Sequence, residues 1–236
     1  MNVALECRGS GEVVELPVGD WRSRATEDEV EVLARVRPAV IDIGCGPGRV
    51  AHELSARGLP ALGIDASPAA VMRARHVGAS AIERSVFDTL PAEGRWGTAI
   101  LFDGNIGIGG DPVVLLRRVV EVIAPDGLVL VELGAPGTAT GSLEVRLRVQ
   151  GQPPGPWFCW ARVAADSMEP LARRAGLDLV DVESKGDRHF AWLHPLVRSN
   201  DVETARGCTV GDPVATENPR TPPSSWPMAP VRVGEW

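Results

Sequence analysis

A glycine-rich turn after a short apolar segment carries the strongest chemical signal in the chain. Residues 42–48 read Asp-Ile-Gly-Cys-Gly-Pro-Gly, and the pattern predicts a helix from about Arg49. Gly44 and Gly46 permit a turn that side chains would block, and they let a ligand approach the backbone. The free N–H groups at the start of the helix favour an anionic ligand group. The loop therefore predicts a site for a nucleotide-like ligand, against the simpler interpretation of a tight strand-to-helix turn.

The spacing of the glycines distinguishes between ligand classes. A dinucleotide fingerprint is Gly-x-Gly-x-x-Gly, but here Arg49 stands at its last position and the third glycine, Gly48, comes one residue earlier. Residues 40–50 resemble the first motif of class I S-adenosylmethionine (SAM)-dependent methyltransferases, whose common form is Asp-Ile-Gly-Cys-Gly-Pro-Gly. The resemblance extends over about residues 39–135, with a weaker match at the last strands. It makes SAM the expected cofactor.

The resemblance assigns roles to the loop itself. The backbone of Gly44, Cys45 and Gly46 is expected to hold the methionine portion of the cofactor. Asp42, which begins the motif, is expected to lie near the cofactor's amino group.

Two later strand ends complete the expected cofactor site. Asp65, with Ala66 beside it, would accept both ribose hydroxyls, because a carboxylate offers two acceptor oxygens to a diol. The alternative is that Asp65 only caps the next helix alongside Ser67. Phe87 would flank the adenine ring and Asp88 would accept from its exocyclic amine. Their alternative roles are core packing and a turn.

The end of the fourth strand is expected to lie between cofactor and acceptor. Asp103 would meet the methionine end of the cofactor, and Asn105 would contact substrate, with a glycine-rich stretch following them. The alternative is a flexible loop leading to a helix cap at Asp111. The stretch differs from the Asn-Pro-Pro-Tyr motif of adenine and glutamine N-methyltransferases, which argues against those substrates.

Methyl transfer demands little chemistry from the protein, because the sulfonium is already an activated leaving group. The enzyme gains mainly by aligning the reacting atoms and excluding water. If the nucleophile must lose a proton, His189 is the candidate catalytic base, with His194 nearby, although a lone histidine is more often structural. Asp103 and Asp111 imitate part of the metal site of catechol O-methyltransferases, but no complete ligand set is present, so no metal is expected.

Acceptor recognition is the least defined part of the prediction. Trp21 and Trp160 are the aromatic candidates for substrate binding, and an aromatic, arginine-bearing cover suits a small planar or anionic molecule. The alternative is a packed hairpin with solvated arginines. Further candidates share an aromatic or cationic side chain: Arg146, Arg148, Trp157 and Arg188.

Alternating strand and helix patterns predict the element order that positions these residues. The fold class is α/β, with a Rossmann-like, seven-stranded, mostly parallel sheet, helices on both faces and an antiparallel last strand. An N-terminal hairpin around residues 9–11 and an inserted β-hairpin after the fifth strand are also predicted. The seven strands are expected at residues 39–43, 61–64, 80–87, 98–102, 128–133, 177–182 and 189–193.

The domain prediction follows from this order. Residues 1–38 form the N-terminal hairpin and a helix capped by Thr26 and Glu29. Residues 39–194 form the SAM-binding domain, with the inserted hairpin at 142–163. Residues 195–236 are predicted to be an irregular Pro-rich tail.

Composition bounds the partners. The net charge of −7 disfavours nucleic acid, because phosphate binding relies on a basic surface. No apolar run approaches the roughly 20 residues of a membrane span, and no signal core is seen. The four cysteines are widely separated, as expected for reduced thiols. A cytoplasmic protein with a small-molecule acceptor follows, and its oligomeric state stays open.

Three functional hypotheses remain. The first is SAM-dependent methylation of a small molecule at oxygen, nitrogen or carbon, in secondary metabolism. The second is a SAM- or S-adenosylhomocysteine (SAH)-binding protein without transferase activity. The third, a nicotinamide-dependent oxidoreductase, is disfavoured by the glycine spacing.

Overall fold

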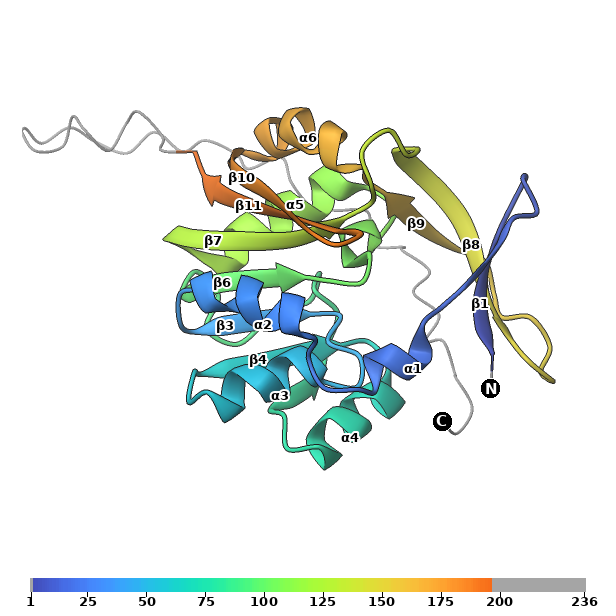
Figure 1. Ribbon diagram of the computed structural model, residues 1–236, viewed down its shortest axis with the longest axis horizontal. Coiled ribbons are helices and arrows are strands. Elements are labelled where there is room, and N and C mark those ends of the chain that lie inside the picture. Colours follow the sequence, from blue (N-terminus) through green and yellow to red (C-terminus); the bar gives the residue numbers. More distant parts are fainter. Residues whose placement is uncertain (1, 197–236) are drawn as a thin grey trace, which may run out of the picture.

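Two β-sheets organise residues 2–196, the part of the chain that the computed structural model describes (Figure 1). The large sheet has seven strands in the order β10-β11-β7-β6-β3-β4-β5. Its strands are β3 (Val40–Ile43), β4 (Ala61–Asp65), β5 (Ala81–Glu83), β6 (Trp96–Leu101), β7 (Ile123–Leu133), β10 (Leu177–Lys185) and β11 (Arg188–Pro195).

The strand directions confirm the predicted sheet. β3 pairs in parallel with β4 and β6, while β5 and β7 extend the parallel pairing on either side. The last strand, β11, runs antiparallel to both β7 and β10. Because parallel strands need crossovers and are buried on both faces, β3 is apolar apart from Asp42 and wholly buried.

Helices cover both faces of the large sheet, as predicted. On one face, α5 and α6 pack on a core that includes Ile41, Leu101 and Val131. On the other, α2 and α3 pack on Val40 and Ile100. The helices are α1 (Val18–Trp21), α2 (Glu27–Val32), α3 (Arg49–Ala56), α4 (Pro68–His76), α5 (Pro112–Val122) and α6 (Met168–Ala175), with short 3₁₀ turns η1 (Leu33–Arg35), η2 (Asn105–Gly107) and η3 (Ala165–Ser167).

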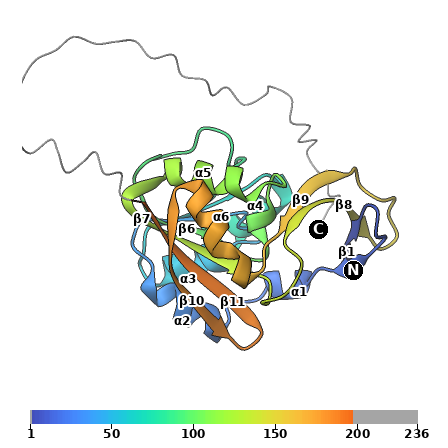
Figure 2. The ribbon, with the colours of Figure 1, turned by 90° about the horizontal axis from the view of Figure 1, so that it is seen from above.

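The small sheet joins the two predicted hairpins into one structure. It consists of β1 (Val3–Cys7), β2 (Val13–Glu15), β8 (Gly141–Val149) and β9 (Phe158–Arg162), in the order β2-β1-β8-β9. Every neighbouring pair is antiparallel. Figure 2 shows β1, β8 and β9 on one side of the large sheet and its helices. The N-terminal segment therefore pairs with the insertion, a contact that the hairpin patterns did not predict.

The predicted third strand at residues 80–87 was too long. β5 ends at Glu83, and a turn follows. In that turn the backbone N–H of Phe87 donates to the Ser85 hydroxyl, and the N–H of Ser85 donates to the Asp88 carboxylate. Such local side-chain bonds satisfy backbone groups that a strand would otherwise pair, so they end the strand early.

Two observations bound the rest of the described chain. Among residues 2–196, no helix combines the length and the hydrophobicity needed to cross a membrane. Of the tail predicted at residues 195–236, all but Pro195 and Leu196 lies outside the described residues.

Candidate active site

The glycine loop turns sharply out of β3 and into α3. Gly44 and Gly46 have φ angles of +73° and +53°, in the left-handed region that favours glycine. The N–H groups of Gly44 and Cys45 both donate to the carbonyl of Ile64, at 2.8 and 3.0 Å. Gly48 precedes α3 and contributes no side-chain cap. The loop is therefore fixed to the end of β4 while the start of α3 stays without a side-chain cap.

Asp65, at the end of β4, binds the loop directly. Its Oδ2 accepts from the N–H of Gly46 at 2.9 Å, and its Oδ1 accepts from the N–H of Ser67 at 2.8 Å. Burial raises the pKa of Asp65 in spite of these two bonds. Ser67 itself caps α4 by accepting from Ala70, and Asp65 supports the preceding turn by accepting from the N–H of Ser67, while each Asp65 oxygen keeps a further lone pair for a ligand.

A small pocket brings several predicted cofactor residues together. Gly44, Asp65 and Ala66 all line it, and its volume is about 40 Å³. Ligand pockets usually measure about 300–1,000 Å³, so this hollow would hold only part of an adenosyl ligand. The other lining residues are Ile43, Ile64, Arg84, Ser85, Val86 and Ile108.

Phe87 and Asp88 lie in the turn beyond β5 rather than at a strand end. Phe87 is 41% exposed, and its ring lies against Gly109. Asp88 accepts from the N–H of Ser85 at 3.1 Å, which is the turn role named as its alternative. Ser85 and Val86, not Phe87 and Asp88, line the small pocket. Their adenine roles therefore stay predictions.

The side chains of Asp42 and Cys45 are buried beneath the backbone of the loop. Asp42 is only 3% exposed, and its Oδ2 has no hydrogen-bond partner among the described residues. Burial raises the pKa of Asp42 to about 7. The Cys45 thiol packs against Gly63 and Ala51 in a buried cluster and lies 3.7 Å from the Gly46 carbonyl, to which it donates.

Asn105 occupies the space beside the loop. Its amide nitrogen donates to the carbonyls of Ile43 and Gly44, both at 2.9 Å. A methyl group at Gly44 would lie 2.5 Å from the same nitrogen, so a larger residue there would displace the Asn105 amide and strain the left-handed backbone. The structure thus shows Asn105 supporting the loop, whereas its predicted contact with substrate stays a prediction.

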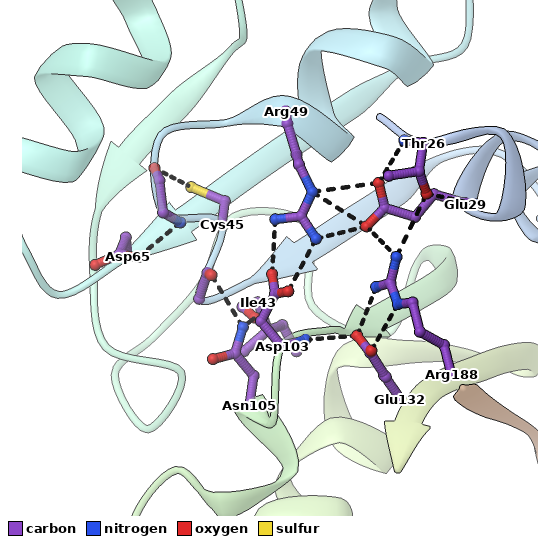
Figure 3. Close-up of polar contacts among 12 residues, drawn as sticks. Thr26, Glu29, Ile43, Cys45, Arg49, Asp65, Asp103, Asn105, Glu132 and Arg188 are labelled. Carbon is purple, nitrogen blue, oxygen red and sulfur yellow. Dashed lines mark hydrogen bonds and ion pairs between the residues drawn. The ribbon is translucent and has the colours of Figure 1, made fainter. Parts of the chain in front are cut away.

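A network of ion pairs lies beside the glycine loop, at the ends of β6 and β7 (Figure 3). Arg49 bonds both oxygens of Asp103, at 2.7 and 2.9 Å, and its Nη2 lies 2.5 Å from Glu29. Arg188 binds Glu29 at 2.9 Å and Glu132 twice, both at 2.8 Å. The N–H of Asp103 donates to Glu132 at 2.8 Å. The network joins α2, α3, β7, β11 and the end of β6.

Within the network, the pKa values of two carboxyl groups shift in opposite directions. Burial opposes the ionisation of Glu29, but hydrogen bonds from Arg49 and the charge of Arg188 outweigh it, so the pKa of Glu29 is lowered. For Asp103, burial outweighs the bond from Arg49, so its pKa is raised. Asp103 also has a φ of +55°, unusual for a residue other than glycine.

Sequence reasoning did not find this network. Glu29 was interpreted only as part of a capping box, which the structure confirms with Thr26. Arg49 was used only to exclude a dinucleotide fingerprint, and Glu132 was not considered. One signal was available: Glu132 is a lone acid in the apolar second half of β7, and a charge in such a strand requires a partner.

The remaining candidates lie at three different places. Trp160, on β9, packs against Gly107 of η2, next to Asn105. Trp21 lies at the end of α1, close to Pro47 and Arg49. The ring of His189 contacts the Ser184 hydroxyl at 2.8 Å. The structure therefore brings Trp160 and Asn105 to one wall, while Trp21 belongs to another pocket.

The candidate metal ligands do not converge in the described residues. Asp111 caps α5 by accepting from the N–H of Val113 and Val114. Asp103 is held by Arg49, and residues 2–196 contain no cluster of three potential ligands.

Comparison with known proteins identifies the family. Residues 18–182, more than half of the chain, match the family model described as a methyltransferase domain. Curated protein sequences gave no significant match. Among solved structures, a SAM-dependent methyltransferase from Bacteroides fragilis, in complex with SAH, is similar with a TM-score of 0.69 and 20% identity. The match covers 84% of this chain and 89% of that one.

Two further solved structures share the fold at lower similarity. The CcbJ methyltransferase from Streptomyces caelestis has a TM-score of 0.54 and 17% identity, covering 71% of this chain and 87% of its own. CalS10, an amino pentose methyltransferase from Micromonospora echinaspora, has a TM-score of 0.54 and 16% identity, covering 75% and 94%. The chain therefore belongs to the methyltransferase-domain family and has the fold of the class I SAM-dependent methyltransferases.

Proposed function

We propose that this protein binds SAM at the Gly44–Gly46 loop and transfers its methyl group to a small-molecule acceptor. One observation carries the proposal: the left-handed glycine backbone at the end of β3 stands beside Asp65, which already holds the N–H of Gly46. A glycine backbone admits a close ligand, and a carboxylate can accept from a ribose diol. This combination fits an adenosyl ligand.

The charge around the loop supports a cationic cofactor. The bound cofactor supplies a sulfonium that activates its methyl group for displacement. Acidic side chains outnumber basic ones within the ion-pair network and Asp42 taken together, and one buried carboxylate oxygen of Asp42 has no partner among the described residues. Unpaired negative charge in a buried site favours a positive ligand. The charged residues are Glu29, Asp42, Asp103 and Glu132 against Arg49 and Arg188.

The residues of this chain would act mainly by orientation. Asp65 and the loop backbone would fix the adenosyl end, and the η2 wall with Asn105 and Trp160 would border the acceptor. Alignment and exclusion of water provide most of the acceleration that such a displacement needs. His189 stays the candidate base for an acceptor that must lose a proton.

The acceptor class and cellular role belong to the proposal as well. CalS10 is described as acting on an amino pentose in calicheamicin biosynthesis, which supports a small acceptor and a role in secondary metabolism. Within residues 2–196, Cys7, Cys45 and Cys159 form no disulfide, which supports a reducing, cytoplasmic location.

A SAM-binding protein without turnover is the second candidate. The observation that favours it is Asn105, whose amide fills the space beside Gly44. If Asn105 keeps this position with cofactor bound, it blocks access to the loop. Methyl incorporation from labelled SAM into a panel of amines, phenols and acids separates binding from transfer.

The cofactor is tested by titration. We expect SAM and SAH to raise the melting temperature of the full chain in a dose-dependent way, because a ligand that binds only the folded state stabilises it. NAD is the comparison ligand and should leave the melting temperature unchanged. Stabilisation by NAD alone would contradict the proposal.

The Asp65→Ala substitution tests the ribose role. We expect it to weaken SAH binding by about 1–3 kcal/mol, the scale for losing hydrogen bonds to a charged group, measured by calorimetry. Asp187→Ala, in the exposed turn between β10 and β11, is the control and should bind as the wild type does. Unchanged SAH affinity in Asp65→Ala would reject the role.

A further inference from the structure

A second pocket lies on the outer side of the glycine loop. It has a volume of about 210 Å³ and is lined by three segments distant in sequence. Figure 1 shows α1 beside α3 and α4, the helices that form it. The lining residues are Trp21, Arg22, Ser23 and Arg24 at and after the end of α1, Pro47, Arg49 and His52 around the start of α3, and Arg73 and Val77 at the end of α4.

The side chains of this pocket that can carry a charge are four arginines and His52, all of them basic. Arg49 is neutralised by Glu29 and Asp103. Arg22, Arg24 and Arg73 form no ion pair or side-chain hydrogen bond within residues 2–196, and no Asp or Glu lines the pocket. Most other described arginines do have acidic partners, for example Arg35 and Arg146. Three unneutralised guanidinium groups around one cavity favour an anion.

Two uncharged features of the pocket favour the same ligand. The indole N–H of Trp21 is buried and has no hydrogen-bond partner in the described part of the chain. A buried donor without an acceptor is costly, so a shift of the Trp21 ring that brought this N–H to an acceptor in the pocket would stabilise the site. The eight-residue helix α3 begins at the pocket wall and has no side-chain cap, so the positive end of its dipole lies next to the pocket.

We propose that this pocket binds the carboxylate or phosphate group of a small molecule other than the cofactor. The volume is several times the roughly 30 Å³ that one water takes in the liquid, so such a group fits. The pocket adjoins the cofactor loop at Pro47 and Arg49, whereas the η2 wall that would border the acceptor contacts Gly44, so the anionic group is bound apart from the predicted acceptor wall.

This pocket is separate from the predicted adenosyl site. The small pocket at Gly44 and Asp65 shares no lining residue with it. The loop itself, from Gly44 to Pro47, lies between the two. A ligand group bound by Arg22 and Arg24 would therefore be an addition to the adenosyl contacts.

Inorganic phosphate is the probe for the anion site. We expect saturable binding to the full-length wild type by calorimetry at constant ionic strength. The double variant Arg22→Gln/Arg24→Gln should bind phosphate about tenfold or more weakly, the effect of losing charged hydrogen bonds. The control, Arg95→Gln/Arg174→Gln, removes two exposed arginines elsewhere and should bind as the wild type does. No saturable binding, or equal weakening in the control, overturns the proposal.

Two adenosyl ligands identify the source of the anion. SAH carries a carboxylate, whereas 5′-methylthioadenosine does not. We expect Arg22→Gln/Arg24→Gln to bind both like the wild type. If it weakens SAH alone, the pocket holds the cofactor's carboxylate and the proposal is wrong. If the wild type binds phosphate but neither adenosyl ligand, the anion site stands and the proposed cofactor fails.

Discussion

The buried carboxylate of Asp42 is the least satisfied charged group next to the loop. It lies in the central strand β3, between β4 and β6, where solvent is excluded. Burial is the main cause that raises its pKa to about 7 from a usual value of 3.8, with further contributions from Asp103 and Asp65. Near neutral pH the Asp42 carboxyl group therefore takes up protons when the chain folds.

The Asp42→Asn variant tests this property through the pH dependence of stability. A raised folded pKa means that ionised Asp42 disfavours the folded state. The penalty is absent below pH 3.8, grows as the pH rises, and is complete above about pH 7. Between pH 5 and pH 8, Asp42→Asn should therefore gain about 1–3 kcal/mol of unfolding free energy relative to the wild type.

Urea unfolding at several pH values measures this difference. Comparing two pH values removes any constant effect of placing an amide in the core. Asp187→Asn, in an exposed turn, is the control substitution. A pH-independent difference for Asp42→Asn would show that Asp42 titrates normally in the folded protein.

Local residue patterns predicted much of the site at this scale. The left-handed glycines, the Thr26–Glu29 capping box and the position of Asp65 all follow from neighbours in the sequence. Phe87 was placed wrongly because two hydrogen bonds of Ser85 and Asp88 decide where β5 ends. The free energies of such a local bond and of continued strand pairing differ only slightly, and the pattern of apolar residues does not show which one is lower.

At the scale of elements, Glu29 connects α2 to the loop edge. Its carboxylate caps the start of its own helix at Thr26, and it binds Arg49 and Arg188 from two other elements. It is 0% exposed. The capping role was predictable because its partner is three residues away, but the ion pairs join residues that only the folded chain brings together.

The Glu29→Gln substitution should loosen α2 selectively. Arg49 keeps Asp103 and Arg188 keeps Glu132, so neither cation is left wholly unpaired. We therefore expect a loss of about 1–3 kcal/mol, below the roughly 3–5 kcal/mol for breaking an isolated buried pair. Urea unfolding measures the loss, and faster amide exchange should be confined mainly to residues 27–35.

Glu27→Gln is the matched control on the same helix. Glu27 lies in the first turn of α2, is exposed and forms no ion pair with a described residue. Its substitution should change the unfolding free energy by less than about 0.5 kcal/mol. Equal effects of the two substitutions would mean that the helix dipole, and not the ion-pair network, governs α2.

At the scale of the whole molecule, the chain forms two sheets, and the small one combines strands from the N-terminal segment with strands of the insertion. β1 pairs with β8 from Val3↔Val149 to Cys7↔Val145, and Glu6 binds Arg146 and Arg148 across this pairing. Each hairpin was predictable from its own turn. Their union was not, because the choice of strand partner depends on tertiary contacts rather than on local pattern.

Deletion of residues 2–16 tests whether the two sheets depend on each other. The N-terminal strands pair only with each other and with β8 among the described strands, whereas the core of the large sheet forms among its own strands and helices. Without β1, β8 becomes an edge strand with unpaired backbone groups. We expect amide exchange to accelerate strongly in Gly141–Val149 and to stay slow in β3, β6 and β7.

Hydrogen-exchange mass spectrometry of the deleted and full chains gives the comparison, with the β10–β11 hairpin as internal reference. Regions that unfold as separate units show independent protection, whereas one cooperative unit loses protection everywhere. Accelerated exchange in Val40–Ile43 as well as in β8 would therefore show that the small sheet stabilises the loop-bearing strand. In that case the N-terminal hairpin would support the cofactor site from a distance, although its described strands form no ladder with the large sheet.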